Sequence, residues 1–359
     1  MFAYYAFSVI IVLAILFEEV ASMSKIGTVF SVVGGLSLFI FGMKTMAIGL
    51  QKATGESTRK LFEFLTNSRI LGVFIGIVVT AVIQSSSATT VMVVGFVNAG
   101  LMTLAQAIGV IMGANIGTTV TAQLVAFKLT DIALPAIAIG VWLELFSKRK
   151  VFKNISSIIL GFGFLFMGMQ IMEGGLLPIA QTPEFNQIIL TFSKYPILGV
   201  LVGFLTTAIV QSSSATIGLL QALALSGQID IGFALPILFG VNIGTCITAL
   251  ISSIGANITA KKAAVLHLVF NIIGAFIFFF LYPIFTPIII KTTADPVRQI
   301  ANAHTLFNVA NTAIQLPFAN LLVGFVENIV PGEDVVIERG FKYIDRRFLN
   351  TPTIAFNQV

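Results

Sequence analysis

The sequence has few charged residues and only one cysteine. Asp, Glu, Lys and Arg make up 10% of its 359 residues, whereas soluble domains contain about 25%. With 57% hydrophobic residues, this composition excludes an ordinary soluble domain. The single cysteine, Cys246, excludes an internal disulfide and a cysteine cluster for a metal. The net charge of +5 comes from basic residues between apolar runs, which orient a membrane protein, so no nucleic acid partner is expected.

Long apolar runs fill most of the chain. Several approach or exceed the roughly 20 residues that a helix needs to cross a bilayer, and many contain glycine, which membrane helices tolerate. The alternating segments of about ten residues that build membrane barrels do not appear. These features predict an all-α, multi-pass integral membrane protein that lies in the lipid bilayer of the cell inner membrane.

One polar cluster occurs twice inside apolar sequence. Residues 84–89 read Gln-Ser-Ser-Ser-Ala-Thr, and the same six residues return at 211–216, 127 positions later. Each copy is followed after an equal gap by Asn-Ile-Gly-Thr, at 115–118 and at 242–245. Two matched polar clusters at one offset predict two related repeats and a shared binding site.

The similarity extends beyond these motifs. Residues 72–121 align without a gap with residues 199–248 and are identical at 19 of 50 positions. Each repeat is expected to hold three crossings and one hairpin that does not cross, at 70–99 and 197–226. Because an odd number of crossings reverses the next unit, we predict two inverted-topology repeats, each with a re-entrant helical hairpin and a broken transmembrane helix.

The expected organisation has five parts. They are an N-terminal helix (1–27), transport repeat 1 (28–154), transport repeat 2 (155–290), a C-terminal transmembrane helix (291–330) and a cytoplasmic tail (331–359). After a retained first helix at 2–17, the predicted spans are 28–50, 104–127, 132–147, 155–180, 231–256, 263–289 and 300–326, with breaks in the second and fifth of these at the Asn-Ile-Gly-Thr motifs.

Polar groups at membrane depth indicate a binding site. Broken helices leave backbone N–H and C=O groups unpaired, which is tolerated only where they line a cavity or bind a ligand. Helix N-termini attract anions, whereas carbonyl and hydroxyl oxygens suit a hard cation such as Na⁺. Ser hydroxyls and Gln amides can donate a hydrogen bond to an anion and can also offer an oxygen to a cation. With no obvious pair of arginines in the spans, an anion would be held by dipoles, hydroxyls and bound cations, which favours cation-coupled transport.

Several other interpretations stay open. Ser and Thr in membrane helices commonly serve helix packing, although packing alone does not explain a duplicated cluster. A carrier of sulfate, arsenate or a dicarboxylate would use the same hydroxyls, and a passive anion channel would need no sodium. An intramembrane serine hydrolase would pair Ser86 or Ser213 with His267 or His304 as the base. Duplication disfavours that enzyme, because a nucleophile and its base form one asymmetric group. The two histidines belong to a second echo, His-x-x-Phe-Asn.

The paired Gln-Ser-Ser-Ser, Asn-Ile-Gly-Thr and His-x-x-Phe-Asn motifs resemble the type II sodium/phosphate cotransporter family, in its bacterial branch. The resemblance covers roughly residues 28–326. It implies sodium-dependent symport of inorganic phosphate by alternating access, with the anion and Na⁺ bound between the two hairpin tips. It implies no organic cofactor and no enzymatic activity, and it allows a homodimer.

The resemblance also implies two overlapping sets of site residues. The phosphate contacts would be Gln84, Ser85, Ser86, Ser87, Gln211, Ser212, Ser213 and Ser214. The sodium contacts would be Gln84, Ser87, Thr89, Asn115, Thr118, Thr119, Gln211, Ser214, Thr216, Asn242 and Thr245. Thr119 is replaced by Cys246 in the second repeat, and a soft sulfur is a poor Na⁺ ligand.

Two features depart from the family pattern. Electrogenic animal members use an intramembrane aspartate that has no counterpart in the predicted spans. Residues 341–352 resemble the lead-in to a PhoU-like helical domain, which the sequence does not continue. Because the aspartate has no counterpart, the sodium stoichiometry is left open.

Overall fold

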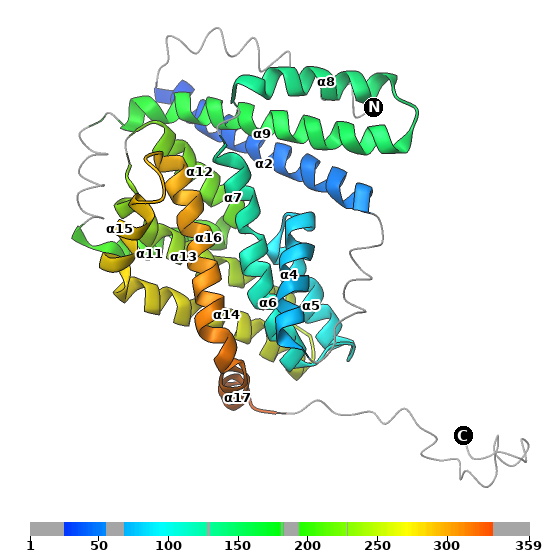
Figure 1. Ribbon diagram of the computed structural model, residues 1–359, viewed down its shortest axis with the longest axis vertical. Helices are drawn as coiled ribbons and strands as arrows, with labels where there is room; N and C mark the ends of the chain where they lie inside the picture. Colours follow the sequence, from blue (N-terminus) through cyan, green and yellow to red (C-terminus); the bar gives the residue numbers. More distant parts are fainter. Residues whose placement is uncertain are drawn as a thin grey trace, which may run out of the picture.

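The computed structural model describes residues 25–54, 68–127, 130–180, 182, 194–227 and 229–332. Every regular element in these residues is a helix, which confirms the all-α prediction (Figure 1). Nearly all of the expected N-terminal helix (1–27) and cytoplasmic tail (331–359) lies outside the described residues.

The α-helices of the described residues are given in chain order. Their bounds are α2 Lys25–Thr54, α4 Arg69–Ile83, α5 Ser86–Asn98, α6 Leu104–Gly117, α7 Thr119–Val125, α8 Ala133–Phe146, α9 Lys150–Ala180, α11 Pro196–Val210, α12 Ser213–Leu225, α13 Ile231–Ser252, α14 Ile258–Phe280, α15 Tyr282–Ile290, α16 Pro296–Gln315 and α17 Ala319–Ile329. Six described helical segments are long and apolar enough to cross a membrane: 27–53, 104–125, 150–178, 231–252, 258–280 and 296–329.

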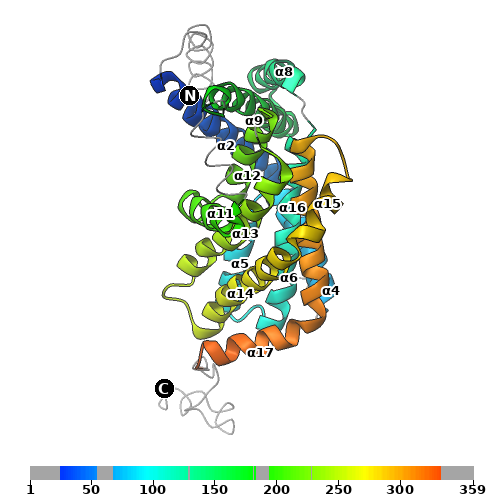
Figure 2. The same ribbon diagram turned by 90° about the vertical axis from the view of Figure 1, so that its left-hand side faces the viewer.

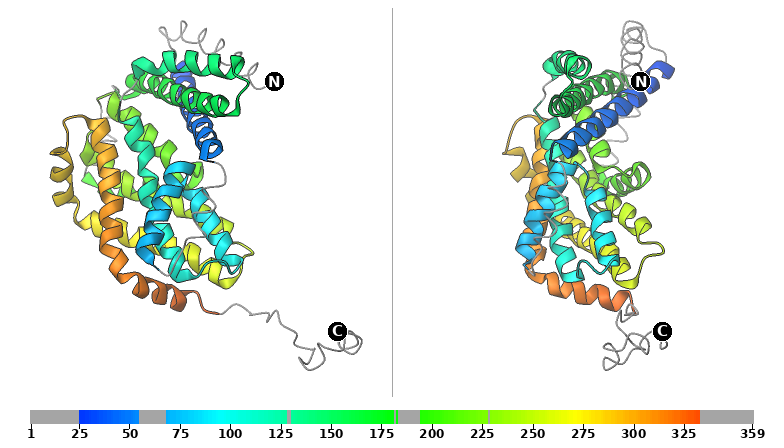
Figure 3. Two further views of the ribbon diagram at one scale, coloured as in Figure 1. Left: turned by 45° about the vertical axis from the view of Figure 1, so that its right-hand side comes forward. Right: turned by 90° about the vertical axis from the view of Figure 1, so that its right-hand side faces the viewer.

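The first helices of the two predicted repeats, α2 and α9, pack against each other through glycines. A Cβ atom on Gly42 would lie 2.6 Å from the carbonyl oxygen of Gly161, and one on Gly35 would lie 2.8 Å from that of Gly168. From Gly35 to Gly42 the residue numbers rise along α2, while those of their partners fall along α9 from Gly168 to Gly161, so the two helices run antiparallel. With α8 they form one end of the molecule and cross the direction of α6, α7 and α16 steeply (Figures 1 and 3).

Both predicted hairpins are present as pairs of short helices. In each pair the first helix has 15 residues and the second has 13. At about 1.5 Å per residue, neither arm reaches the roughly 30 Å of a hydrocarbon core. The first arms pack closely on α6 and α13 through glycines, because a Cβ at Gly76 or Gly203 would collide with backbone atoms of these helices. The entry of each hairpin into a bilayer stays a prediction, as does the inverted relation of the repeats.

The two spans predicted to be broken differ from each other. The first is interrupted at Thr118, between α6 and α7, where the backbone keeps a right-handed conformation (φ −65°, ψ −22°). The second, α13, is continuous from Ile231 to Ser252, so the predicted break at 242–245 is wrong. The Thr245 hydroxyl donates to the Val241 carbonyl one turn earlier, and Gly244 provides close contact with α11 rather than a break.

Three further boundaries differ from expectation. The span predicted at 263–289 ends at Phe280, and Pro283 opens the separate helix α15, because proline has no N–H to continue the ladder. The last span divides near Pro317 into α16 and α17, and α17 lies across the end of the molecule (Figure 2). The span predicted at 132–147 is the 14-residue α8, which is too short to count among the six.

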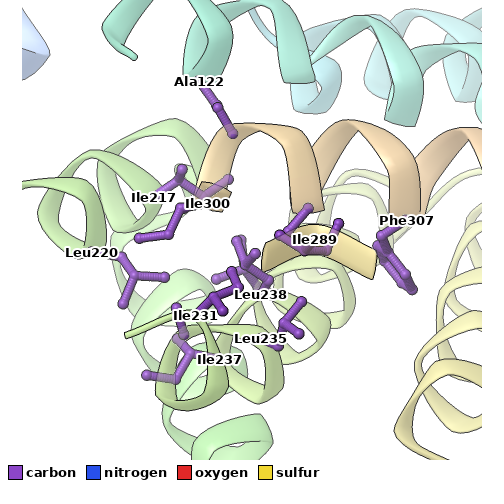
Figure 4. Close-up of a cluster of buried hydrophobic side chains, with 14 of the residues drawn as sticks. Ala122, Ile217, Leu220, Ile231, Leu235, Ile237, Leu238, Ile289, Ile300 and Phe307 are labelled. Carbon is purple, nitrogen blue, oxygen red and sulfur yellow. The ribbon is translucent and has the colours of Figure 1, made fainter. Parts of the chain in front are cut away.

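An apolar cluster joins α12, α13, α14, α15 and α16. Phe239 lies 5.1 Å from Phe307, and Phe307 lies 4.9 Å from Phe278, between ring centroids. Ile289 of α15 is fully buried in this cluster, which shows that α15 packs back onto the bundle (Figure 4). The cluster packs α13 against α16, and both helices carry polar residues of the candidate site.

Candidate functional site

Each Gln-Ser-Ser-Ser cluster forms the turn between the two helices of a hairpin. Gln84 (φ 59°) and Gln211 (φ 54°) adopt the left-handed conformation, and they are the only non-glycine residues with positive φ in the described chain. Their backbone N–H groups donate to the carbonyls of Thr80 and Thr207, both at 2.7 Å, and so close the first helix of each hairpin. A side chain in this conformation stores on the order of 1 kcal/mol, so both turns are held in place by their surroundings.

The second helix of each hairpin begins at the middle serine of its cluster. Ser85 and Ser212 have extended backbones, and their hydroxyl oxygens accept from the N–H groups of Ala88 (3.1 Å) and Ala215 (3.2 Å). They are therefore N-caps, and α5 and α12 point their N-terminal ends at the turns. Free N–H groups and a partial positive charge make such ends suitable for an anion.

A relay of hydroxyls fixes each turn from inside the hairpin. Thr80 donates to Thr89 at 2.9 Å, and Thr89 donates to the Ser85 carbonyl at 3.1 Å. The second hairpin repeats this pattern through Thr207 and Thr216. Sequence reasoning selected Thr89 and Thr216 but not their partners, although identity of Thr80 and Thr207 between the repeats was an available signal.

Each Asn-Ile-Gly-Thr motif lies against its own hairpin. A Cβ on Gly117 would lie 2.6 Å from the Ile77 carbonyl oxygen, and one on Gly244 would lie 2.6 Å from that of Phe204. Ile77 and Phe204 occupy equivalent turns of α4 and α11. The glycine of each motif therefore lets α6 or α13 approach the hairpin about two turns before the left-handed glutamine.

A buried chain of side chains joins the two Asn-Ile-Gly-Thr motifs. Asn115 donates to Asn271 and Asn242 donates to Asn308, both at 2.7 Å. Asn271 also donates to the sulfur of Cys246 at 3.3 Å, and the Cys246 thiol lies 3.5 Å from the carbonyl oxygens of both Asn242 and His267, one of which accepts its proton. Cys246 thus links the halves, a role that its position opposite Thr119 did not suggest.

His267 completes the first half of this chain. Asn271 donates to the His267 carbonyl (3.0 Å), so its amide oxygen receives the hydrogen bond from Asn115. The Asn115 amide oxygen is then the acceptor for His267 Nε2 at 3.2 Å, which places the proton of a neutral ring on Nε2. Asn271 and Asn308 were missed as site residues, although both end the His-x-x-Phe-Asn echo.

The predicted site residues differ in exposure. Most are buried: Ser86, Thr89, Asn115, Thr118, Thr119, Ser213, Thr216, Asn242 and Thr245. Partly buried are Gln84, Ser85, Ser87, Ser212 and Ser214, and Gln211 is exposed. Thr119 donates to the carbonyl of Ile116 near the end of α6, which leaves its lone pairs free for a cation. Hydrogen bonds join the two Asn-Ile-Gly-Thr motifs to each other, and each hairpin packs on its own motif about two turns before its left-handed glutamine.

The network contains no permanently charged side chain. The buried polar residues of the described chain are Ser, Thr, Asn, Gln and His, with no Asp, Glu, Lys or Arg. Neutral amides and hydroxyls present both donors and acceptors, so they suit an anion and a hard cation side by side. The described residues also hold no group of three His, Cys, Asp or Glu that could bind a metal.

The arrangement expected of a serine hydrolase is not observed. His267 Nε2 contacts Asn115, while His267 Nδ1 and both ring nitrogens of His304 have no hydrogen-bond partner among the described residues. Neither histidine therefore activates Ser86 or Ser213 in this structure.

Comparison with known proteins agrees with the motifs. The Na⁺/Pi-cotransporter family matches the chain twice, over residues 38–174 and 168–316. YqeW of Bacillus subtilis strain 168, whose name assigns no activity, is 30% identical over 298 residues, which cover 82% of this chain and 96% of YqeW. No solved structure matches the chain.

Two further relatives have names that state a function. A provisionally named inorganic phosphate export protein, YjbB of Escherichia coli K12, is 26% identical over 91% of this chain and 61% of its own length. Sodium-dependent phosphate transport protein 2A of Rattus norvegicus is 37% identical over 26% of this chain and 15% of its own length. The two family matches, which together span both sets of motifs, establish that the chain belongs to the Na⁺/Pi-cotransporter family.

Proposed function

We propose that this protein is a secondary active transporter that couples inorganic phosphate to Na⁺ in the cell inner membrane. The observation that carries the proposal is the pair of Gln-Ser-Ser-Ser turns, each with a left-handed glutamine, a serine N-cap and a helix N-terminus directed at the turn. Two such ends supply N–H and O–H donors for an oxyanion without a fixed positive charge.

The residues divide between anion and cation by their chemistry. Ser86, Ser87, Ser213 and Ser214 begin the helices and offer donors to phosphate. Asn115, Thr118, Asn242 and Thr245, with Thr89 and Thr216 in the hairpins, offer oxygens to Na⁺. Bound Na⁺ then supplies the positive charge that the polar network lacks, which makes phosphate binding depend on sodium. Alternating access by two inverted repeats follows from the predicted topology.

The direction of transport has two candidates. The mammalian relative's name favours sodium-driven uptake, whereas the name of YjbB favours export of phosphate. The residues of the site suit either direction, because a symporter runs along its net driving force. We propose uptake under an inward Na⁺ gradient and treat export as the second candidate.

The test is radiolabelled phosphate flux in proteoliposomes. With Na⁺ outside, the protein should accumulate phosphate inside, and replacing Na⁺ by K⁺ should abolish accumulation. Gln84→Ala and Gln211→Ala should each lower the rate at least tenfold, whereas Gln106→Ala, an amide in the cap of α6, should retain transport. Excess sulfate should not compete, because sulfate has no proton to donate to a Gln or Asn oxygen at neutral pH.

Other outcomes identify the alternatives. Efflux from preloaded vesicles that exceeds uptake at equal gradients would favour an exporter. Flux at the same rate in Na⁺ and K⁺ would indicate a passive channel. No phosphate flux in correctly inserted protein, in either direction, would contradict the proposal.

A further inference from the structure

The two halves of the site share a threonine–glutamine pair and a histidine–asparagine pair, but these pairs differ in their hydrogen bonds. In the first half, the hydroxyl of Thr121 on α7 donates to the amide oxygen of Gln84 at 2.8 Å. The equivalent pair, 127 residues later, is Thr248 and Gln211. The Thr248 hydroxyl is buried without a partner among the described residues, and the Gln211 side chain is exposed.

The histidines repeat this difference. His267 Nε2 lies 3.2 Å from the amide oxygen of Asn115 in the first half. His304 is fully buried, yet neither ring nitrogen is paired within the described chain, although Asn308 holds Asn242 as Asn271 holds Asn115. The hydrogen bond between His267 and Asn115 in the first half therefore has no counterpart between His304 and Asn242 in the second half.

The helices that carry these residues also differ. The first span is interrupted at Thr118, three residues before Thr121, whereas α13 continues through Thr245 to Ser252. α7 contacts both α4 and α12. These features separate the first half from the second, although the threonine, glutamine, histidine and asparagine of the two halves are the same; the replacement of Thr119 by Cys246 is a difference in sequence between them.

Identical residues with different bonds indicate two conformations rather than two chemistries. A buried hydroxyl or imidazole without a partner destabilises the conformation that contains it. The unpaired atoms of the second half have natural partners, which are the residues that pair in the first half. In a second conformation, the hydrogen bonds of these pairs would be formed in the second half and absent in the first half. Since the same types of bond are exchanged, its free energy would be similar.

We propose that two matched pairs of hydrogen bonds, which we call latches, form in turn. The first latch consists of Thr121–Gln84 with His267–Asn115, and the second consists of Thr248–Gln211 with His304–Asn242. The structure shows the first latch closed and the second open. Thr121, Thr248, His267 and His304 are then positioning residues that act through the glutamine or asparagine that each one binds. The inference rests on the proposed alternating-access function and adds the contacts that distinguish its two states.

This proposal predicts effects of opposite sign. Thr121→Val keeps the shape of the side chain, removes the first latch's hydroxyl and favours the second state. Thr248→Val removes the second latch's hydroxyl and favours the first state. Since one neutral hydrogen bond is involved, each change should shift the ratio of the states roughly two- to tenfold. The double variant should return the ratio close to that of the parent.

The ratio can be measured by cysteine labelling. The only native cysteine, Cys246, is fully buried and kept, and its slow labelling in the parent is subtracted. A single added cysteine replaces either Ile83 or Val210, the equivalent residues before the two glutamines. A membrane-impermeant maleimide added to either side of proteoliposomes reports which turn is open. Thr121→Val should speed labelling at position 83 and slow it at position 210, and Thr248→Val should do the reverse. Thr121→Ser and Thr248→Ser, which keep the hydroxyl, should resemble the parent.

The outcomes separate this inference from the proposed function. Shifts in the same direction for both Thr→Val variants, or no shift in either, would overturn the latches even if the parent transports phosphate. Opposite shifts in a protein without phosphate flux would support the latches and reject the proposed substrate. If Thr121→Val fails to fold, Thr248→Val still decides, because it removes a hydroxyl that is unpaired in this structure.

Discussion

At the scale of single residues, the left-handed glutamines combine a strained backbone with an amide in the candidate site. Glycine adopts this conformation without strain, so folding alone would favour glycine at positions 84 and 211. The sequence has glutamine at both positions instead. We infer that the side chain is retained for binding, at the expense of some stability.

Replacing these glutamines by glycine tests that inference. Gln211→Gly should raise the free energy of unfolding by up to about 1 kcal/mol, because strain is relieved. In Gln84→Gly this gain is offset by loss of the acceptor for the Thr121 hydroxyl, so the free energy of unfolding should stay about unchanged. Both should lose sodium-dependent phosphate uptake. Thermal unfolding in detergent and uptake in proteoliposomes measure the two effects. A Gly variant that transports at the parental rate would show that only the turn's backbone matters.

The residues of the site were predictable where duplication marked them and not elsewhere. The offset of 127 residues identifies both glutamines, the serines and the two motif asparagines. Asn271 and Asn308 are separated by only 37 residues, so they fall outside that offset. The His-x-x-Phe-Asn echo marks both asparagines, but their role depends on the way α14 and α16 pack on α6 and α13, which that echo does not specify.

At the scale of helices, the contact between α2 and α9 depends on having no side chain at its closest points. Gly42→Ala and Gly161→Ala would each press a methyl group against backbone atoms of the other helix. Since backbone cannot move aside cheaply, each change should lower stability by about 1–3 kcal/mol.

The same two helices provide matched controls. Gly34 and Gly174 have nothing within 4 Å of an added Cβ, so Gly34→Ala and Gly174→Ala should leave the unfolding temperature unchanged or slightly raised. Thermal unfolding followed by size-exclusion chromatography compares all four variants. Equal effects at the two kinds of position would show that this helix contact is absent in the membrane.

Helix positions were predicted better than helix breaks. Apolar runs and their lengths located both hairpins, because a run of about 15 residues is too short to span and must turn. The glycines of the two Asn-Ile-Gly-Thr motifs allow either a break or a close contact, and only packing decides between these outcomes. Pro283 and Pro317 were available signals for the ends of α14 and α16.

At the scale of the whole molecule, cargo binding should be linked to stability. If Na⁺ supplies the charge that phosphate needs, each ion should bind more tightly when the other is present. Na⁺ with phosphate should raise the unfolding temperature by more than the sum of the separate increases, with a gain of about 2.7 kcal/mol at one hundred times the dissociation constant. K⁺ with phosphate, and Na⁺ with sulfate, serve as controls. Strictly additive shifts would argue against coupled binding.

The absence of Asp, Glu, Lys and Arg from the buried polar residues of the described chain also has an electrical consequence. A membrane voltage does work of about 2.3 kcal/mol per elementary charge per 100 mV, but only on charge that moves through it. With neutral histidines, the empty site carries no formal charge, so its return step should be insensitive to voltage. All current during transport would then be carried by the cargo, and its size per phosphate would report directly how many Na⁺ ions accompany each anion.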